Sequence, residues 1–215
     1  MRIAGSLLLL IIVLWLLKYL HWEKSPGQAV KIKSSSLIST PLLKDKDFLL
    51  KLKHVAKAIR NYADSKNFSD GICFLIDMNI PSGKHRFFIY NMGKDSIEVA
   101  GLVTHGSGSD NGDGELSFSN KPGSNCTSLG TYRTGKSYDG KFGLAYKLHG
   151  LEESNSKAFE RFVVLHAHEC VPQKEVHPMV ICQSWGCPTV SPGMLQIIKK
   201  YIESSEKPIL LNIYK

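Results

Sequence analysis

The order of apolar and polar positions divides the chain into three parts. Residues 3–17 are almost all apolar, residues 24–46 are rich in Ser, Lys, Pro and Gly, and residues 47–215 carry short, regularly spaced apolar runs. The third part is long enough to bury a hydrophobic core of its own. We therefore expect a signal anchor or signal peptide over residues 1–23, a linker over residues 24–46 and one folded domain over residues 47–215.

Two periodicities predict the elements of this domain. Leu52, Val55 and Ile59 are spaced three and four residues apart, which predicts an amphipathic helix over residues 47–65. A second long helix is expected over residues 192–204, and short apolar runs between turn residues predict strands. The remaining predicted elements are strands at 72–76, 86–90, 97–103, 130–134, 144–148, 161–167 and 208–214, with a short helix near 155–160. Many short strands with few helices indicate an α+β, mainly β domain.

Residues 106–128 differ from the rest of the predicted domain. They contain many Gly, Ser, Asn and Asp residues and few hydrophobic ones. A loop this long inside a compact domain is usually functional or mobile. The segment is therefore predicted to be a loop of one of these two kinds.

The N-terminal apolar run predicts export. Its 15 residues lie between Arg2 and Lys18. This length suits the core of a signal peptide and is slightly shorter than a spanning helix, which needs about 20 residues. Residues 19–23 are bulky where a signal peptidase requires small side chains. We therefore favour an uncleaved signal anchor, with residues 3–20 at the membrane, over a cleaved signal peptide.

The charge of the chain is basic but dispersed. Lys and Arg number 27 against 19 Asp and Glu, which gives a net charge of +8. The lysines are spread along the chain, so a solvated basic surface is the simplest interpretation. An anionic envelope polymer or lipid is compatible with this charge. A nucleic-acid partner is not expected, because no nucleic-acid-binding motif accompanies the charge.

One cysteine is the strongest candidate for catalytic chemistry. Cys187 follows Gly186 in the segment Ser184-Trp185-Gly186-Cys187-Pro188-Thr189, where a tight turn can present its sulfur to a substrate. The alternative is a buried, inert cysteine, which is the commoner fate of this residue type. The chain has five cysteines, so at least one thiol stays free in an oxidising compartment, and sequence alone does not choose the pairing of the others.

Two histidines upstream are candidate bases. The apolar residues 163–165 predict a buried strand that runs into His166 and His168, and strand alternation puts both on one face. Seventeen and 15 residues separate them from Ser184, so the spacing does not choose between them. A thiol beside an imidazole suits acyl transfer, because the thiolate is the nucleophile.

These residues resemble the murein L,D-transpeptidase catalytic domain family, which has a YkuD-type fold. That family has a His at the end of a strand and, further along the chain, a Ser/Thr-His-Gly-Cys box. The chain is most similar to the branch whose box reads Ser-Trp-Gly-Cys-Pro. The similarity covers about residues 47–215 and includes residues 74–77, 86–88, 103–109, 118–120, 140–143 and 150–152.

The resemblance implies a mechanism and a location. It implies acyl transfer by Cys187 on peptidoglycan stem peptides through a thioester, as an L,D-transpeptidase or an L,D-carboxypeptidase, without cofactor or metal. His166 is the implied base, because a small residue such as Ala167 follows the strand-end His in this branch, and His168 is the alternative. The expected location is the bacterial envelope, on the periplasmic side of the inner membrane.

Roles are also expected for the residues before the nucleophile. Backbone N–H groups of the turn at Trp185, Gly186 and Cys187 would hold an oxyanion. The Ser184 hydroxyl would fix that turn. Trp185 either covers the substrate channel or serves packing alone.

The sequence departs from the family pattern at two positions. Trp185 stands where the commoner box has His, and Thr189 stands where an Arg is common. An Arg there could bind a substrate carboxylate in a bidentate manner, which Thr cannot do. We expect Thr189 at the substrate cleft, and His105 either bordering that cleft or serving as a polar turn residue.

Two other functions are compatible with the sequence. One is a non-catalytic, membrane-tethered module that binds the cell wall. The other is a zinc site that uses the clustered side chains of His166, His168, Cys170, Cys182 and Cys187. Their spacing lacks the usual paired C-x2–4-C form, which argues against zinc.

Overall fold

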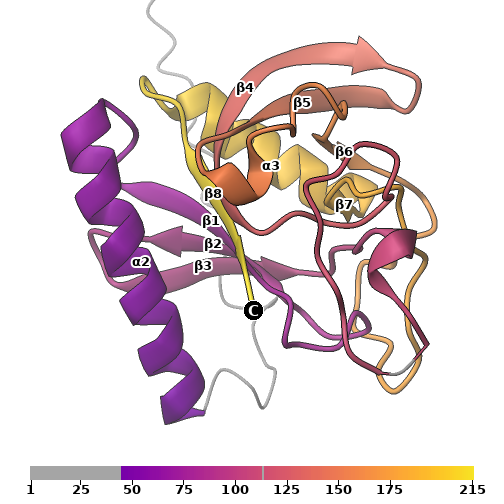
Figure 1. The fold of residues 1–215 in the computed structure, drawn as a ribbon. Helices are drawn as coiled ribbons and strands as arrows, with labels where there is room; N and C mark the ends of the chain where they lie inside the picture. Colours follow the sequence, from indigo (N-terminus) through magenta and orange to yellow (C-terminus); the bar gives the residue numbers. More distant parts are fainter. Residues whose placement is uncertain (1–44, 113) are drawn as a thin grey trace, which may run out of the picture. The chain divides into compact units, whose positions relative to one another are not determined.

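The computed structural model of the protein describes residues 45–112 and 114–215. These residues form an eight-stranded sheet with two α-helices, α2 (Lys46–Lys66) and α3 (Pro192–Ser204) (Figure 1). The strands are β1 (Ile72–Asp77), β2 (Phe87–Asn91), β3 (Ser96–Gly101), β4 (Gly130–Gly140), β5 (Gly143–Gly150), β6 (Val164–Ala167), β7 (Thr189–Val190) and β8 (Leu210–Tyr214). The prediction of a mainly β, α+β domain is confirmed.

The membrane segment expected over residues 3–20 and nearly all of the expected linker lie outside the described residues. Within residues 45–112 and 114–215, no helix combines the length and the hydropathy that crossing a bilayer requires.

The sheet is mixed, and its strands run in the order β3-β2-β1-β8-β4-β5-β6-β7. The β1–β8 and β6–β7 pairs are parallel, whereas the other neighbours are antiparallel. The C-terminal strand β8 therefore joins the β1–β3 meander to the β4–β6 meander. The short pair β6–β7 forms one edge, and it holds His166 directly opposite Thr189.

Both faces of the central strands are buried. On β1, Phe74 and Ile76 belong to the core that includes α3, whereas Cys73 and Leu75 belong to the core that includes α2. Successive side chains of a strand point to opposite faces of the sheet. The sequence of a strand that is covered on both faces is therefore an unbroken apolar run. This is why residues 72–76 show continuous apolar character in place of alternation.

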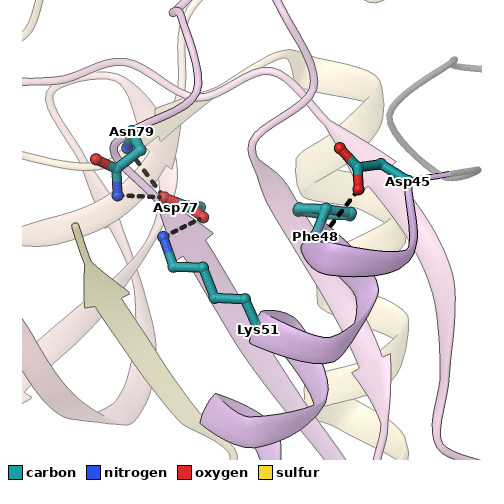
Figure 2. Close-up of polar contacts among 5 residues, drawn as sticks. All are labelled: Asp45, Phe48, Lys51, Asp77 and Asn79. Atoms are coloured by element: carbon teal, nitrogen blue, oxygen red, sulfur yellow. Dashed lines mark hydrogen bonds and ion pairs between the residues drawn. The ribbon is translucent and has the colours of Figure 1, made fainter.

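Helix α2 confirms the helix predicted over residues 47–65 and is anchored at its N-terminus (Figure 2). The Asp45 carboxylate caps it, because it accepts from the backbone N–H groups of Asp47 at 2.9 Å and Phe48 at 3.3 Å. One turn on, Lys51 Nζ lies 3.1 Å from Asp77 Oδ2 at the end of β1. The other Asp77 oxygen accepts from the backbone and side chain of Asn79. The buried Asp77 therefore fixes the helix to the sheet.

Three local predictions differ from the structure. The β4–β5 hairpin is longer than the strands predicted at 130–134 and 144–148, and β7 was not predicted. The short helix predicted near 155–160 is wrong: a 3-10 turn, η3 (Glu153–Asn155), leads into irregular turns. The reason is that the Asn155 side chain accepts from Glu152 N and donates to Thr131 O, which ends the helical turn at this residue.

Candidate active site

Residues 184–187 form a tight turn held by the side chain of Ser184. The Ser184 hydroxyl donates to Cys187 O at 2.6 Å and accepts from Gly186 N at 3.2 Å. The backbone of Ser184 pairs with the segment that opens the 106–128 loop, accepting from Ser107 N at 2.7 Å and donating to His105 O at 2.9 Å. The turn is thus fixed from within and from the neighbouring loop.

Glycine is the residue type that fits position 186 of this turn. Its φ is +109°, a conformation that residues with a Cβ rarely adopt. A Cβ there would lie 2.8 Å from Cys126 O and 3.2 Å from Arg161 Nη2. The conformation of the turn therefore depends on this glycine.

Cys187 lines a cavity of about 240 Å³ together with the other candidate side chains. The thiol is free. Its sulfur accepts from Val164 N at 3.5 Å and lies 3.7 Å from Phe162 O. The cavity is lined by Thr104, Phe142, His166, His168, Cys170, Cys182, Gln183, Ser184, Trp185, Cys187 and Thr189. The candidate nucleophile and both candidate bases thus face one cavity.

The Cys187 thiol and the His166 imidazole are both neutral at rest. Burial raises the pKa of Cys187, against the Val164 N–H group and the Arg161 charge, which lower it. Burial lowers the pKa of His166, and the Ala167 carbonyl partly offsets this. A neutral thiol needs a base during the reaction, because it is not ionised beforehand.

His166 is oriented by two hydrogen bonds and one ring contact. Its Nδ1 lies 3.1 Å from Ala167 O, and its Nε2 lies 3.0 Å from Thr189 Oγ1. The ring of Phe142, at the tip of the β4–β5 hairpin, stacks on the imidazole with 5.2 Å between ring centroids. Nε2 therefore faces Thr189, within the cavity that Cys187 also lines.

His168 lies in a different setting from His166. It is exposed, and its Nδ1 accepts from the backbone N–H of Cys170 at 3.1 Å. Its ring and that of Phe142 form a T-shaped pair, with 5.7 Å between ring centroids. The two histidines that the sequence left equivalent are thus distinguished by burial and by partners.

Arg161 is a site residue that the sequence did not indicate. Its Nη2 donates to Cys126 O at 2.6 Å, and its Nη1 donates to Ser119 O at 2.9 Å. These bonds fix the 106–128 loop beside the turn, and the guanidinium charge lowers the pKa of Cys187. No local sequence pattern indicates that a single Arg in a turn will bind backbone carbonyls of a distant loop.

His105 does not itself line the cavity, but it contacts Ser184 and Gln183, which do. It is buried, and its Nδ1 accepts from Arg86 Nη2 at 3.0 Å, while Arg86 also donates to Val103 O. Burial, followed by the Arg86 charge, lowers the pKa of His105 to about 4, while Asp110 raises it. The imidazole of His105 is therefore neutral at pH 7, and its backbone carbonyl accepts from Ser184 N.

This pKa predicts a stability change at acidic pH. The unfolded chain protonates His105 near its ordinary pKa of 6.5, whereas the folded protein does so only near 4. The unfolded state therefore binds more protons between these values, and the free energy of unfolding falls as the pH drops from 6.5 to 4. Urea unfolding of wild type and His105→Gln across this range checks it: the variant should show a shallower dependence. Parallel curves would contradict the expectation.

The five cysteines have four different settings. Cys170 and Cys182 form a disulfide, which lies at the cavity. Cys73 is in the core, where burial raises its pKa to about 12. Cys126 is buried, and its thiol donates to Gly108 O at 3.0 Å. Cys187 is the one free cysteine among the described residues that lines the cavity.

The disulfide joins the segment after β6 to the segment before the turn, and its loss should destabilise the domain. The two half-cystines are 12 residues apart, and closing a loop of that size stabilises a fold by about 3 kcal/mol. The Cys170→Ser/Cys182→Ser double variant should therefore lose about 2–4 kcal/mol of unfolding free energy in urea. Cys126→Ser, which keeps a donor for Gly108 O, is the control. A double variant as stable as the control would contradict this.

The disulfide also bears on the zinc alternative. It joins two of the five proposed ligands, Cys170 and Cys182, to each other. In the part of the chain that the structure describes, no group of three or more His, Cys, Asp and Glu side chains is arranged to hold a metal ion.

Comparison with known families identifies the class of protein. A family model described as the L,D-transpeptidase catalytic domain matches residues 45–211. Because this match covers most of the chain, the protein belongs to the L,D-transpeptidase catalytic domain family. No curated protein matches the chain.

Several solved structures are similar to the chain at low identity. The L,D-transpeptidase from Xylanimonas cellulosilytica is 13% identical with a TM-score of 0.39, over 67% of this chain and 60% of that one. The Ldtfm–avibactam carbamoyl enzyme is 11% identical with a TM-score of 0.42, over 68% and 50%. A variant of the helical cell shape determining protein Pgp2 from Campylobacter jejuni is 13% identical with a TM-score of 0.45, over 83% and 57%. The chain thus spans 50–60% of the length of these three proteins.

Proposed function

We propose that this protein is a cysteine acyltransferase of the bacterial cell envelope that acts on peptidoglycan stem peptides. The observation that carries the proposal is that a free cysteine, Cys187, and His166 line the same cavity in a member of this family. The turn before the cysteine is held rigidly by Ser184, which suits a nucleophile presented to a substrate.

In the proposed mechanism, His166 removes the proton of Cys187 as the sulfur attacks an amide carbonyl of the stem peptide. The scissile bond joins the L centre of diaminopimelate to D-alanine. The amide C–N bond breaks, the leaving amine takes the proton from His166, and D-alanine departs from a thioester. An amine of a second stem then attacks the thioester carbonyl, the C–S bond breaks, and the proton of the amine returns to the Cys187 sulfur through His166, which leaves a crosslink; water in place of the amine would give carboxypeptidase activity.

The developing oxyanion needs hydrogen-bond donors from the turn. Gly186 N–H already donates to Ser184 Oγ, so the proposal assigns the oxyanion to the N–H groups of Trp185 and Cys187. One good donor of this kind contributes about 3–4 kcal/mol to stabilisation of the transition state.

Recognition of the substrate's acidic end follows from the composition of the cavity. Among the described residues that line it, none is Arg or Lys. Thr189 occupies the position of the family's Arg. The substrate carboxylate is therefore proposed to bind without a bidentate ion pair inside this cavity.

The proposed location is the periplasmic side of the inner membrane, with residues 3–20 as an anchor. The Cys170–Cys182 disulfide supports an oxidising compartment. The basic charge of the chain is compatible with the anionic envelope.

The experiment that tests this function is a muropeptide profile of sacculi incubated with wild type or Cys187→Ala. New crosslinks or shortened stems with wild type alone would support the proposal and would distinguish the two reactions. Binding to sacculi with unchanged muropeptides would instead support the non-catalytic wall-binding module.

A further inference from the structure

The hydroxyl of Thr189 contacts the ring nitrogen that His166 needs in order to act as a base. Thr189 Oγ1 lies 3.0 Å from His166 Nε2, and the two side chains are 3% and 7% exposed. The parallel pairing of β6 and β7 places these two residues opposite each other. A hydrogen bond buried in this way is not readily exchanged for water. The hydroxyl and the ring thus form a fixed pair.

The other hydrogen bonds of His166 set the direction of this one. Ala167 O, 3.1 Å from Nδ1, can only accept, so Nδ1 carries the proton of the neutral ring. Nε2 is then a lone pair, and the Thr189 hydroxyl donates to it. The tautomer is assigned from these bonds. In it Nε2 carries no proton, so it can accept one once the Thr189 hydroxyl proton turns away.

The same hydroxyl can also serve the protonated ring. Once Nε2 carries a proton, it becomes a donor, and Thr189 Oγ1 can accept from it. The hydroxyl proton can then turn toward Cys187 O, which lies 3.5 Å from Thr189 Oγ1. Hydrogen bonds to charged groups are stronger than those between neutral groups. The hydroxyl therefore favours the state in which His166 holds the proton.

We propose that Thr189 is a positioning residue that holds His166 Nε2 in both protonation states and so promotes proton transfer from Cys187. In that step the S–H bond breaks, the proton moves to Nε2, and the electron pair stays on sulfur. The inference rests on the proposed function, in which His166 is the base. It gives a role to the threonine that replaces the family's common arginine.

The test measures alkylation of Cys187 by iodoacetamide as a function of pH. The full chain in detergent is compared as wild type, Thr189→Val and Thr189→Ser, and the modified cysteine is identified by peptide mass mapping. Thr189→Val should react about tenfold more slowly near pH 7 and at the wild-type rate at alkaline pH, where the thiol ionises without a base. Thr189→Ser, which keeps the hydroxyl, should stay within about threefold of wild type throughout.

Three results would overturn the inference. They are a Thr189→Val profile identical to wild type, a Thr189→Val rate reduced equally at every pH, and a Thr189→Ser variant as slow as Thr189→Val. The second result would mean that the residue serves packing. The His166→Ala variant separates this inference from the proposed function. If His166→Ala reacts at the wild-type rate at pH 7, His166 is not the base and the proposed function fails. If His166→Ala is slow but Thr189→Val reacts normally, only the role of Thr189 is refuted.

Discussion

Replacing Cys187 by alanine is expected to abolish cleavage of a stem tetrapeptide, with kcat/KM falling at least about 10³-fold. No other described free cysteine faces the cavity: Cys73 is in the core and Cys126 is buried against Gly108. The fold should be retained, because the sulfur of Cys187 makes only long contacts with Val164 N and Phe162 O. Release of D-alanine from a purified tetrapeptide measures the effect.

Cys126→Ser is the matched control for this variant. It removes a second free thiol while keeping a hydroxyl that can donate to Gly108 O. We expect it to retain activity within a few-fold. Equal loss of activity in both variants would show that the assay reports a general effect of removing sulfur from the domain.

The second large effect is expected at His166. Its removal should lower kcat/KM by about 10²–10⁴, the usual contribution of a positioned general base. His166→Asn should show this loss, whereas His168→Asn should lose less than about tenfold, because His168 is exposed and its Nδ1 accepts from Cys170 N. Steady-state kinetics on the same tetrapeptide distinguish the two.

The reverse order of the two losses would assign the base to His168. Equal losses would show that neither imidazole alone takes the proton. A pH profile adds an independent reading, because burial lowers the pKa of His166. The acidic limb of kcat/KM should therefore lie below the ordinary pKa of histidine.

The sequence was sufficient to predict most of the fold. Helix α2 and strands β1, β2 and β8 were found because their residues pack into buried cores with a clear period or an unbroken apolar run. Strand β7 was missed because it is two residues long, and its strand character comes from pairing with β6. The irregular chain after η3 was missed because the Asn155 side chain sets it.

The sequence identified the candidate turn and both histidines but not their surroundings. Arg161 reaches Cys126 and Ser119 across 35 and 42 residues of chain, and Arg86 reaches His105 across 19. Such contacts depend on the tertiary fold, so no local pattern predicts them. The same applies to the Cys170–Cys182 disulfide, which the cysteine count could not choose, and to the Thr189 contact with His166.

A covalent acyl-enzyme at Cys187 is detectable by intact-mass spectrometry after incubation with a carbapenem. This class of compound is known to acylate the family. We expect wild type to gain the mass of one carbapenem, peptide mapping to place it on Cys187, and Cys187→Ala to gain nothing. An adduct that persists in Cys187→Ala, or a wild type that gains no mass, would show that Cys187 is not the nucleophile.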